Sequence, residues 1–373
     1  MRTILLGAGA SAEAGVCTAK QMAREIYNSL RNRDEIEEAM DIAIGGLKNH
    51  RAIVSGQPFE EIDVEDLYEV LKLLGDRQSH LLAPFVGSWS HVFTARAKPD
   101  TSWIIRDAVR ELEEGIHNAL PRDREKPRGR GIDSRGFAHR LTEAIELATG
   151  ANTDAFVDAA NAVLKTLVNH CWIDSEISVS YLAPLIESSP RDSLWIASLN
   201  YDNTIELAAK QAGIPVSIGI SEESTIVSFP GNSVISLAKL HGSVNWEFDR
   251  KTGQWVIKDG PAWPPALVFG SGNKLTVDGP FLDLLFAFRT QLENSSALEV
   301  CGYSFRDPHV NHLILNWLTK DPNRKLQVFD PNLSSDGIYN AINTTIFPLR
   351  LNVDVVHRQI SLAQISAAEW ART

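Results

Sequence analysis

A short apolar segment near the N-terminus, Ile4–Leu6, runs directly into a glycine-rich turn that contains Gly7, Gly9 and Ser11. The residues after this turn predict a helix that begins near Ser11 and continues to Leu30. A glycine turn between a strand and a helix lets backbone N–H groups approach a phosphate at the positive end of the helix dipole. This order of elements is typical of the first strand of a doubly wound α/β domain, although Gly-Ala-Gly also occurs in turns that bind no ligand.

Three later apolar segments also end in polar residues. Short apolar segments that alternate with helical patterns indicate a parallel sheet, and ligands of such sheets bind at the carboxyl ends of the strands. We therefore expect the polar residues to gather at one edge of the sheet. The segments and the residues that follow them are Trp195–Leu199 with Asn200 and Asp202, Val234–Leu240 with His241, Gly242 and Ser243, and Leu298–Cys301 with Gly302, Tyr303 and Ser304.

The order of the elements predicts a discontinuous domain. We expect an α/β fold in which residues 1–30 and 190–355 form a Rossmann-like parallel sheet with its helices. A large, mostly helical insertion is expected over residues 31–189, and a C-terminal helix over residues 356–373. The other expected elements are strands Ala266–Phe269, Leu326–Phe329 and Leu349–Val355, helices Asp202–Gln211, Phe281–Glu293 and Pro308–Leu318, and a hairpin over Phe248–Lys258.

Size, charge and cysteine content narrow the classes of function. The 373 residues suffice for one large domain or two ordinary ones. A formal net charge of −11 disfavours a general nucleic-acid-binding surface, which is normally basic. No apolar run approaches the roughly 20 residues of a membrane-spanning helix, and Gly7 interrupts the N-terminal apolar segment too early for a signal peptide. The three widely separated cysteines favour a cytoplasmic location.

The Gly-Ala-Gly-Ala-Ser, Asn-Tyr-Asp, Leu-His-Gly-Ser and Gly-Tyr-Ser-Phe-Arg-Asp-Pro-His segments occur here in one order. This series resembles the sirtuin-like NAD-consuming enzymes, and in particular a zinc-free bacterial branch found in antiviral defence systems. The resemblance covers about the first 30 residues and residues 190–335, whereas residues 31–190 resemble no family that we can name. It implies NAD as substrate and, for relatives found beside a HerA-type ATPase, a partner of that kind.

The resemblance implies catalytic roles for Asn200 and His241. The Asn200 amide can fix a water or a ribose hydroxyl near the reacting carbon, although asparagine also commonly turns the chain at the end of a strand. His241 suits a general base near neutral pH, although a single histidine is more often structural. Asp202 is implied to bind the nicotinamide amide, and it could equally cap the helix that begins at Thr204.

The remaining positions implied by the resemblance hold the dinucleotide. Gly7, Ala8, Gly9 and Ser11 are expected to cradle the diphosphate, and Gly15 is expected to permit close helix packing. Gly302 and Ser304 are expected to lie toward the diphosphate or the adenine-side ribose. Asp330 and Asn332 are expected to meet the adenosine ribose, although Asp-Pro-Asn is also an ordinary turn. A carboxylate at Asp330 would repel a 2′-phosphate, which favours NAD over NADP.

Two departures argue against the chemistry of the protein-deacetylating sirtuins. Those enzymes carry a structural zinc ribbon, and this chain lacks the paired Cys-x-x-Cys segments that such a ribbon needs. Leu199 also replaces the polar residue usual at that position in deacetylases. His309 and His312 have the spacing of one helical turn, but no third ligand is evident, so no metal site is predicted.

The sequence therefore predicts an NAD hydrolase that produces nicotinamide and ADP-ribose and acts as an effector of a prokaryotic defence system. A protein deacylase, an ADP-ribosyltransferase and a non-catalytic nucleotide sensor remain as alternatives. Because such a hydrolase would harm its host if always active, we expect control by homo-oligomerisation or by a partner such as a HerA-type ATPase. We expect no direct contact with nucleic acid or membrane.

Overall fold

The computed structural model describes residues 2–55, 62–76, 153–189, 193–220, 227–230, 234–269, 279–334, 336–338, 340, 354–366 and 370. The chain divides into two compact units, which we describe separately. The sheet unit comprises Met1–Met22 and Thr166–Thr373, and the helical unit comprises Ala23–Lys165.

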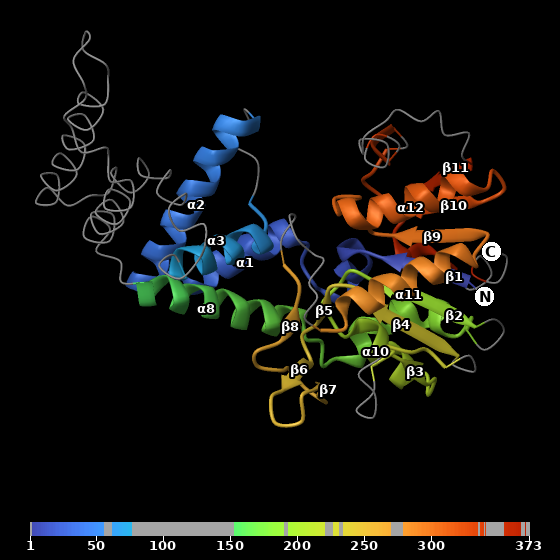
Figure 1. Ribbon diagram of the computed structural model, residues 1–373, viewed down its shortest axis with the longest axis horizontal. Coiled ribbons are helices and arrows are strands. Elements are labelled where there is room, and N and C mark those ends of the chain that lie inside the picture. The colour runs from blue at the N-terminus through green and yellow to red at the C-terminus, as the bar shows by residue number, and fades with distance from the viewer. Residues whose placement is uncertain are drawn as a thin grey trace, which may run out of the picture. The chain divides into compact units, whose positions relative to one another are not determined.

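A seven-stranded sheet forms the centre of the sheet unit (Figure 1), and every pair of neighbouring strands in it is parallel. The strand order is β11-β10-β9-β1-β2-β4-β3, so the most N-terminal strand lies in the middle. This arrangement confirms the predicted α/β, Rossmann-like class. The strands are β1 (Arg2–Leu6), β2 (Leu194–Ser198), β3 (Val216–Ser217), β4 (Ile235–Lys239), β9 (Ala297–Cys301), β10 (Lys325–Phe329) and β11 (Asp354–Arg358).

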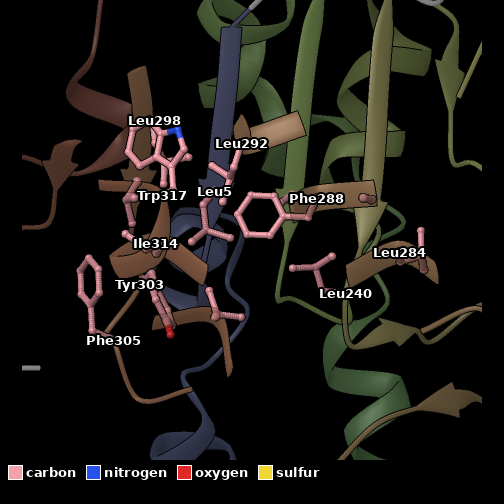
Figure 2. Close-up of a cluster of buried hydrophobic side chains, with 14 of the residues drawn as sticks. Leu5, Leu240, Leu284, Phe288, Leu292, Leu298, Tyr303, Phe305, Ile314 and Trp317 are labelled. Carbon is pink, nitrogen blue, oxygen red and sulfur yellow. The ribbon is translucent and has the colours of Figure 1, made fainter. Parts of the chain in front are cut away.

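Helices cover both faces of this sheet, because alternate residues of each central strand point to opposite sides. Leu5 of β1 belongs to a cluster with α11 (Phe281–Glu293) and α12 (Pro308–Lys320), part of which is drawn in Figure 2. Ile4 and Leu6 belong to a second cluster on the other face. That face is covered by η4 (Glu176–Leu182), α9 (Ala183–Ile186), α10 (Thr204–Gln211) and η5 (Leu362–Gln364).

Two small antiparallel pairs follow β4. β6 (Trp246–Asp249) and β7 (Gln254–Ile257) form the predicted hairpin. The segment expected as a strand at Ala266–Phe269 is shorter, and it lies outside the main sheet. It forms β8 (Ala266–Leu267), which pairs with β5 (Gly242–Ser243) directly after His241.

The helical unit contains α2 (Asp34–Ser55), α3 (Val64–Gly75) and the greater parts of α1 (Ala19–Leu30) and α8 (Thr153–Cys171). Asp63 caps α3 by accepting the backbone N–H of Asp66 at 2.9 Å. The Asp66 carboxylate in turn pairs with Arg51 of α2. Across the described ranges, no helix combines the length and apolar character that a bilayer crossing requires.

Two expectations about element boundaries were wrong. The helix expected from Ser11 is interrupted: the 3-10 helix η1 (Ala8–Ala14) ends at Gly15, whose φ is +86°, and α1 begins only at Ala19. The helix expected over residues 356–373 does not begin at residue 356, because β11 continues to Arg358 and pairs in parallel with β10, and within the described part Leu362–Gln364 form the 3-10 helix η5. Of the strand expected at Leu349–Val355, residues 349–353 lie outside the described residues.

The expected insertion, residues 31–189, contributes elements to both units. Its later part includes η4 and α9, whose apolar residues Val179, Leu182, Leu185 and Ile186 pack in the cluster on the sheet. Helical spacing alone could not distinguish these residues from those of the helical unit, because both sets bury an apolar face.

Candidate functional site

The glycine turn after β1 and the turn after β9 meet at the carboxyl edge of the sheet. The backbone N–H of Gly9 donates to the carbonyl oxygen of Gly302 at 2.9 Å. A Cβ atom on Gly7 would lie 2.6 Å from the Cα atom of Tyr303, and one on Gly302 would lie 2.3 Å from the backbone nitrogen of Ala10. Gly302 also has a φ of +62°. This close approach therefore requires glycine even without a ligand.

The strand order makes this meeting place the topological switch point of the sheet. β1 lies between β2, which continues toward β4, and β9, which continues toward β10. In doubly wound sheets, ligands bind in the crevice beyond the carboxyl ends of the strands at the point where the strand order reverses. The sequence-predicted residues after β1, β2, β4 and β9 all lie at this edge.

Most N–H groups of the glycine turn already have acceptors. Those of Gly7, Gly9 and Ala10 donate to the carbonyl oxygens of Cys301, Gly302 and Gly7, respectively. The N–H of Ala8 lies at the first position of η1, where no partner exists within a helix. Of the predicted cradle, the exposed Ala8 N–H is therefore the group that best suits a phosphate, whereas Ser11 is buried and its hydroxyl oxygen accepts a hydrogen bond from Asn200.

Gly15 serves a purpose other than the one we expected. A Cβ atom at this position would meet no atom within 4 Å, so close packing does not require glycine. Glycine is required here by its positive φ of 86°, a left-handed conformation that ends η1.

Asn200 is held by the glycine turn. Its Nδ2 donates to the carbonyl oxygen of Gly7 and to Oγ of Ser11, both at 2.9 Å. Because a carbonyl oxygen can only accept, this contact determines which end of the amide faces Gly7. Both amide hydrogens are thus used inside the protein, and Oδ1 is left as the acceptor available to a ligand. Among the described residues, two side-chain polar atoms are fully buried and have no hydrogen-bond partner, Arg2 Nε and Trp246 Nε1. Oδ1 of Asn200 is not one of these fully buried atoms.

Asp202 lies two residues before Thr204, the first residue of α10. Oδ1 of Asp202 accepts the backbone N–H of Thr204 at 3.1 Å and its hydroxyl at 2.6 Å. The N-cap residue of α10 is Asn203, so Asp202 bonds to the first N–H group of the helix from one position further out, and both bonds use the same carboxylate oxygen. The contact of Asp202 with the nicotinamide amide stays a prediction. Both side chains are buried.

The buried cation of Lys239 stabilises the loop that carries Asn200 and Asp202. Its Nζ contacts Oγ of Ser243 at 2.6 Å, Oε1 of Glu206 at 3.0 Å and the carbonyl oxygen of Asp202. The residue is 1% exposed, so these acceptors replace its hydration. Lys239 therefore joins the end of β4 to the first turn of α10.

His241 is paired with a residue from the other side of β1. Its Nε2 lies 2.9 Å from Oδ2 of Asp307, and both side chains are buried. Gly242 holds the histidine in place: its φ is +86°, and a Cβ atom there would lie 2.0 Å from the carbonyl oxygen of Ala266. Oδ1 of Asp307 separately accepts the first N–H groups of α12.

Asn200 and His241 occupy equivalent positions on neighbouring strands. Ser198 of β2 is paired with Lys239 of β4, and each functional residue lies two positions beyond its member of that pair. They are therefore adjacent at the carboxyl edge, each oriented by a different partner.

The residues expected near the adenosine are placed further along the same edge. Ser304 is exposed after β9. Oδ1 of Asp330, after β10, accepts the backbone N–H groups of Asn332 at 2.8 Å and Leu333 at 2.9 Å, so this segment is the ordinary turn that the sequence also allowed. The hydrogen bonds of Asp330 do not join it to Asn200 or His241.

Sequence reasoning gave no role to three residues that shape this site. They are Asp307, Lys239 and Tyr181, whose hydroxyl donates to the carbonyl oxygen of Ala10 at 2.7 Å. An aspartate before Pro308 is a usual helix-capping signal, and a lone lysine inside an apolar strand is a signal of a buried cation. Neither signal shows which residue Asp307 or Lys239 would bind.

The described residues hold no group of three or more histidine, cysteine or acidic side chains arranged for a metal ion. Cys17 is half-buried, and Cys171 and Cys301 are buried free thiols. Burial raises the pKa of both buried thiols well above that of an exposed cysteine, so they remain protonated at neutral pH.

Comparison with known families identifies the same region. Residues 195–336 match the family model described as a SIR2-like domain, and this range includes Asn200, His241 and Asp307. The match supports a sirtuin-like family for the chain and an NAD-related activity, since SIR2-like domains use NAD. No curated protein matches the chain.

Proposed function

We propose that this protein hydrolyses NAD to nicotinamide and ADP-ribose. The observation that carries the proposal is the orientation of Asn200, whose amide hydrogens are both bound by Gly7 and Ser11 while Oδ1 remains as an acceptor. This acceptor lies at the switch point, beside His241 on the neighbouring strand, within the range that matches a SIR2-like domain.

The reaction requires a nucleophile at one carbon of the nicotinamide ribose. The bond from C1′ to the ring nitrogen breaks, and nicotinamide leaves with the electron pair as a neutral molecule. A water oxygen then bonds to C1′, and His241 takes the proton that this water loses. Oδ1 of Asn200 accepts a hydrogen bond from that water or from a ribose hydroxyl, which fixes it near C1′.

The rest of the dinucleotide fits the same edge of the sheet. The exposed Ala8 N–H would meet the diphosphate, while the buried Ser11 holds Asn200, and the exposed Ser304 lies after the neighbouring strand β9. The adenosine ribose would then lie toward the turn at Asp330. The negative charge of that turn favours NAD over NADP as the substrate.

The direct test is NAD consumption by the purified chain, with nicotinamide and ADP-ribose quantified by chromatography. We expect Asn200→Ala and His241→Ala to lower kcat by about 10²–10⁴-fold, the range usual for positioned acid–base groups. Asn316→Ala and His312→Ala are the matched controls, since both are exposed on α12, and they should retain full turnover.

Other outcomes would favour the alternatives. Turnover that depends on an acyl-lysine peptide would indicate a protein deacylase, and transfer of ADP-ribose to protein would indicate an ADP-ribosyltransferase. Tight NAD binding without turnover would indicate a nucleotide sensor. Unchanged NAD hydrolysis in both the Asn200→Ala and His241→Ala variants would contradict the proposed mechanism.

We further propose that this activity serves a cytoplasmic prokaryotic defence system that depletes NAD during phage infection. In this role the protein would act as a homo-oligomer controlled by a partner such as a HerA-type ATPase. Phage challenge of cells that carry the wild-type or Asn200→Ala chain, each with and without a co-expressed HerA-type ATPase, tests the role. Light scattering of the purified chain measures its oligomeric state.

A further inference from the structure

We infer that Asp307 is a positioning residue that selects the tautomer of His241, so that Nδ1 is the nitrogen that accepts the proton. This inference deepens the proposed hydrolysis and rests on it for its catalytic meaning. The tautomer itself is a property of the protein alone.

The two oxygens of the Asp307 carboxylate have separate tasks. Oδ1 accepts the backbone N–H groups of His309 at 2.9 Å and Val310 at 3.2 Å, which caps α12. Oδ2 lies 2.9 Å from Nε2 of His241. An ionised carboxylate can only accept, so a neutral His241 must carry its hydrogen on Nε2 and leave the lone pair on Nδ1.

The loop around Asp307 is held rigidly, as an orienting group requires. The hydroxyl of Tyr303 accepts the backbone N–H of Asp307 at 3.1 Å and donates to Oδ1 of Asn311 at 2.8 Å. Nδ2 of Asn311 donates to the carbonyl oxygen of Phe305 at 2.7 Å, and Phe305 has a φ of +55°. A non-glycine residue held in this left-handed region marks a loop whose conformation is determined by its surroundings.

The pairing also spans the predicted site. Asp307 follows β9 and His241 follows β4, and β1 and β2 lie between these two strands in the sheet. The glycine turn and Asn200 follow those two inner strands. The imidazole of His241 is therefore held by a residue that follows β9, whereas its own backbone follows β4, on the other side of β1 and β2.

The substitution Asp307→Asn tests this inference. Asparagine caps helices about as well as aspartate, so Oδ1 can keep its task in α12. Its Nδ2 would face Nε2 of His241 and donate to it, so the hydrogen of the imidazole moves to Nδ1. The matched control is Asp63→Asn, which makes the same change at the cap of α3.

The primary measurement is long-range ¹H–¹⁵N NMR of histidine-labelled full-length protein at a pH where His241 is neutral, with the resonance assigned by loss in His241→Gln. We expect Nε2 to be protonated in the wild-type chain and Nδ1 to be protonated in Asp307→Asn. A wild-type His241 protonated on Nδ1 would overturn the inference, and this outcome needs no variant that alters Asp307.

Kinetics provide the second measurement. In the Ser-His-Asp triad, the same carboxylate-to-amide change lowers kcat by about 10⁴-fold through the wrong tautomer. We expect Asp307→Asn to lower kcat for NAD by at least about 10²-fold with KM within about threefold of wild type. Asp63→Asn should change neither constant. Wild-type kcat in Asp307→Asn would overturn the catalytic part of the inference.

The two proposals can fail separately. If the wild-type chain hydrolyses no NAD either alone or with a HerA-type ATPase, but its His241 is protonated on Nε2 and switches in Asp307→Asn, the proposed function fails and the tautomer assignment stands. If NAD hydrolysis requires His241 but Nδ1 carries the hydrogen, the proposed function stands and the inference about Asp307 fails.

Discussion

At the level of single residues, this site depends on buried polar groups whose donors are bound within the protein. Asn200 donates both amide hydrogens to the turn that it faces, and Lys239 distributes its charge over several acceptors. A buried polar group costs free energy unless it is paired, so each of these contacts also limits how its partner can be oriented. The orientation of these side chains is therefore set by neighbouring groups of the protein.

The ion pair between Lys239 and Glu206 should contribute measurably to stability. The Lys239 side chain is 1% exposed and that of Glu206 is 19% exposed, so water screens this pair only partly. We expect a double-mutant cycle with Lys239→Met and Glu206→Gln to give a coupling free energy of about 1–2 kcal/mol in denaturant unfolding. A second cycle on Lys258 and Glu247, a more exposed pair at 3.4 Å, is the control. That pair should couple by less than about 1 kcal/mol. Equal coupling free energies in both pairs would show that the burial of Lys239 does not strengthen its ion pair with Glu206.

At the level of elements, both faces of the central strands are buried, and each face binds different helices. Leu5 faces the cluster with α11 and α12, whereas Ile4 and Leu6 face the cluster with α10 and η4. An amphipathic helix is held mainly by its apolar face. In α11, Phe288 is completely buried and stacks with Trp195 at 6.0 Å between ring centroids, while Phe286 is 65% exposed.

These two phenylalanines of one helix allow a matched test. Phe288→Ala should lower the free energy of unfolding of the sheet unit by about 3–5 kcal/mol, because it leaves a cavity between α11 and the sheet. Phe286→Ala removes the same atoms from an exposed position and should change it by less than about 1 kcal/mol. Chemical denaturation followed by tryptophan fluorescence measures both. Similar losses would contradict the assignment of the buried face of α11.

At the level of the whole molecule, the sheet unit is assembled from distant parts of the chain. β1 comes from the first residues, yet it pairs with β2 and β9, which follow about 190 and 290 residues later, as the pairings of Arg2 with Leu194 and Ile4 with Glu299 show. Such long-range parallel pairing is slow to form, but it leaves β1 hydrogen-bonded to a strand on each side. In the described part of the helical unit, in contrast, α2 packs against α3, which is close to it in the sequence.

This organisation predicts how a defect in the central strand spreads. Leu5→Ala should cost about 2–5 kcal/mol and should speed amide hydrogen exchange in β1, β2, β9 and the helices packed on them. Exchange in α2 and α3 should remain as in wild type. Peptide-level hydrogen–deuterium exchange of both chains measures this. An equal acceleration in α2 and α3 would show that the two units unfold as one.

Local sequence patterns were sufficient for the main elements of the sheet unit. Apolar runs bounded by glycine or polar residues identified β2, β4, β9 and β10 to within about one residue, because residues buried on both faces leave a continuous apolar signature. The same reasoning placed Asn200 and His241 at one edge, since the carboxyl ends of parallel strands coincide. It failed where the pattern was ambiguous, as for the helix expected at Ser11 and the strand that became β8.

The chain alone thus determined the fold class and the residue types at the edge of the sheet, since both follow from local periodicity and from strand direction. Only the tertiary structure decided how the side chains of those residues are oriented and which groups they bind. The orientation of Asn200 depends on Gly7 and Ser11, about 190 residues away, and that of His241 depends on Asp307, 66 residues away. Hydrogen-bond partners of this kind are brought together by the strand order, which no local pattern records.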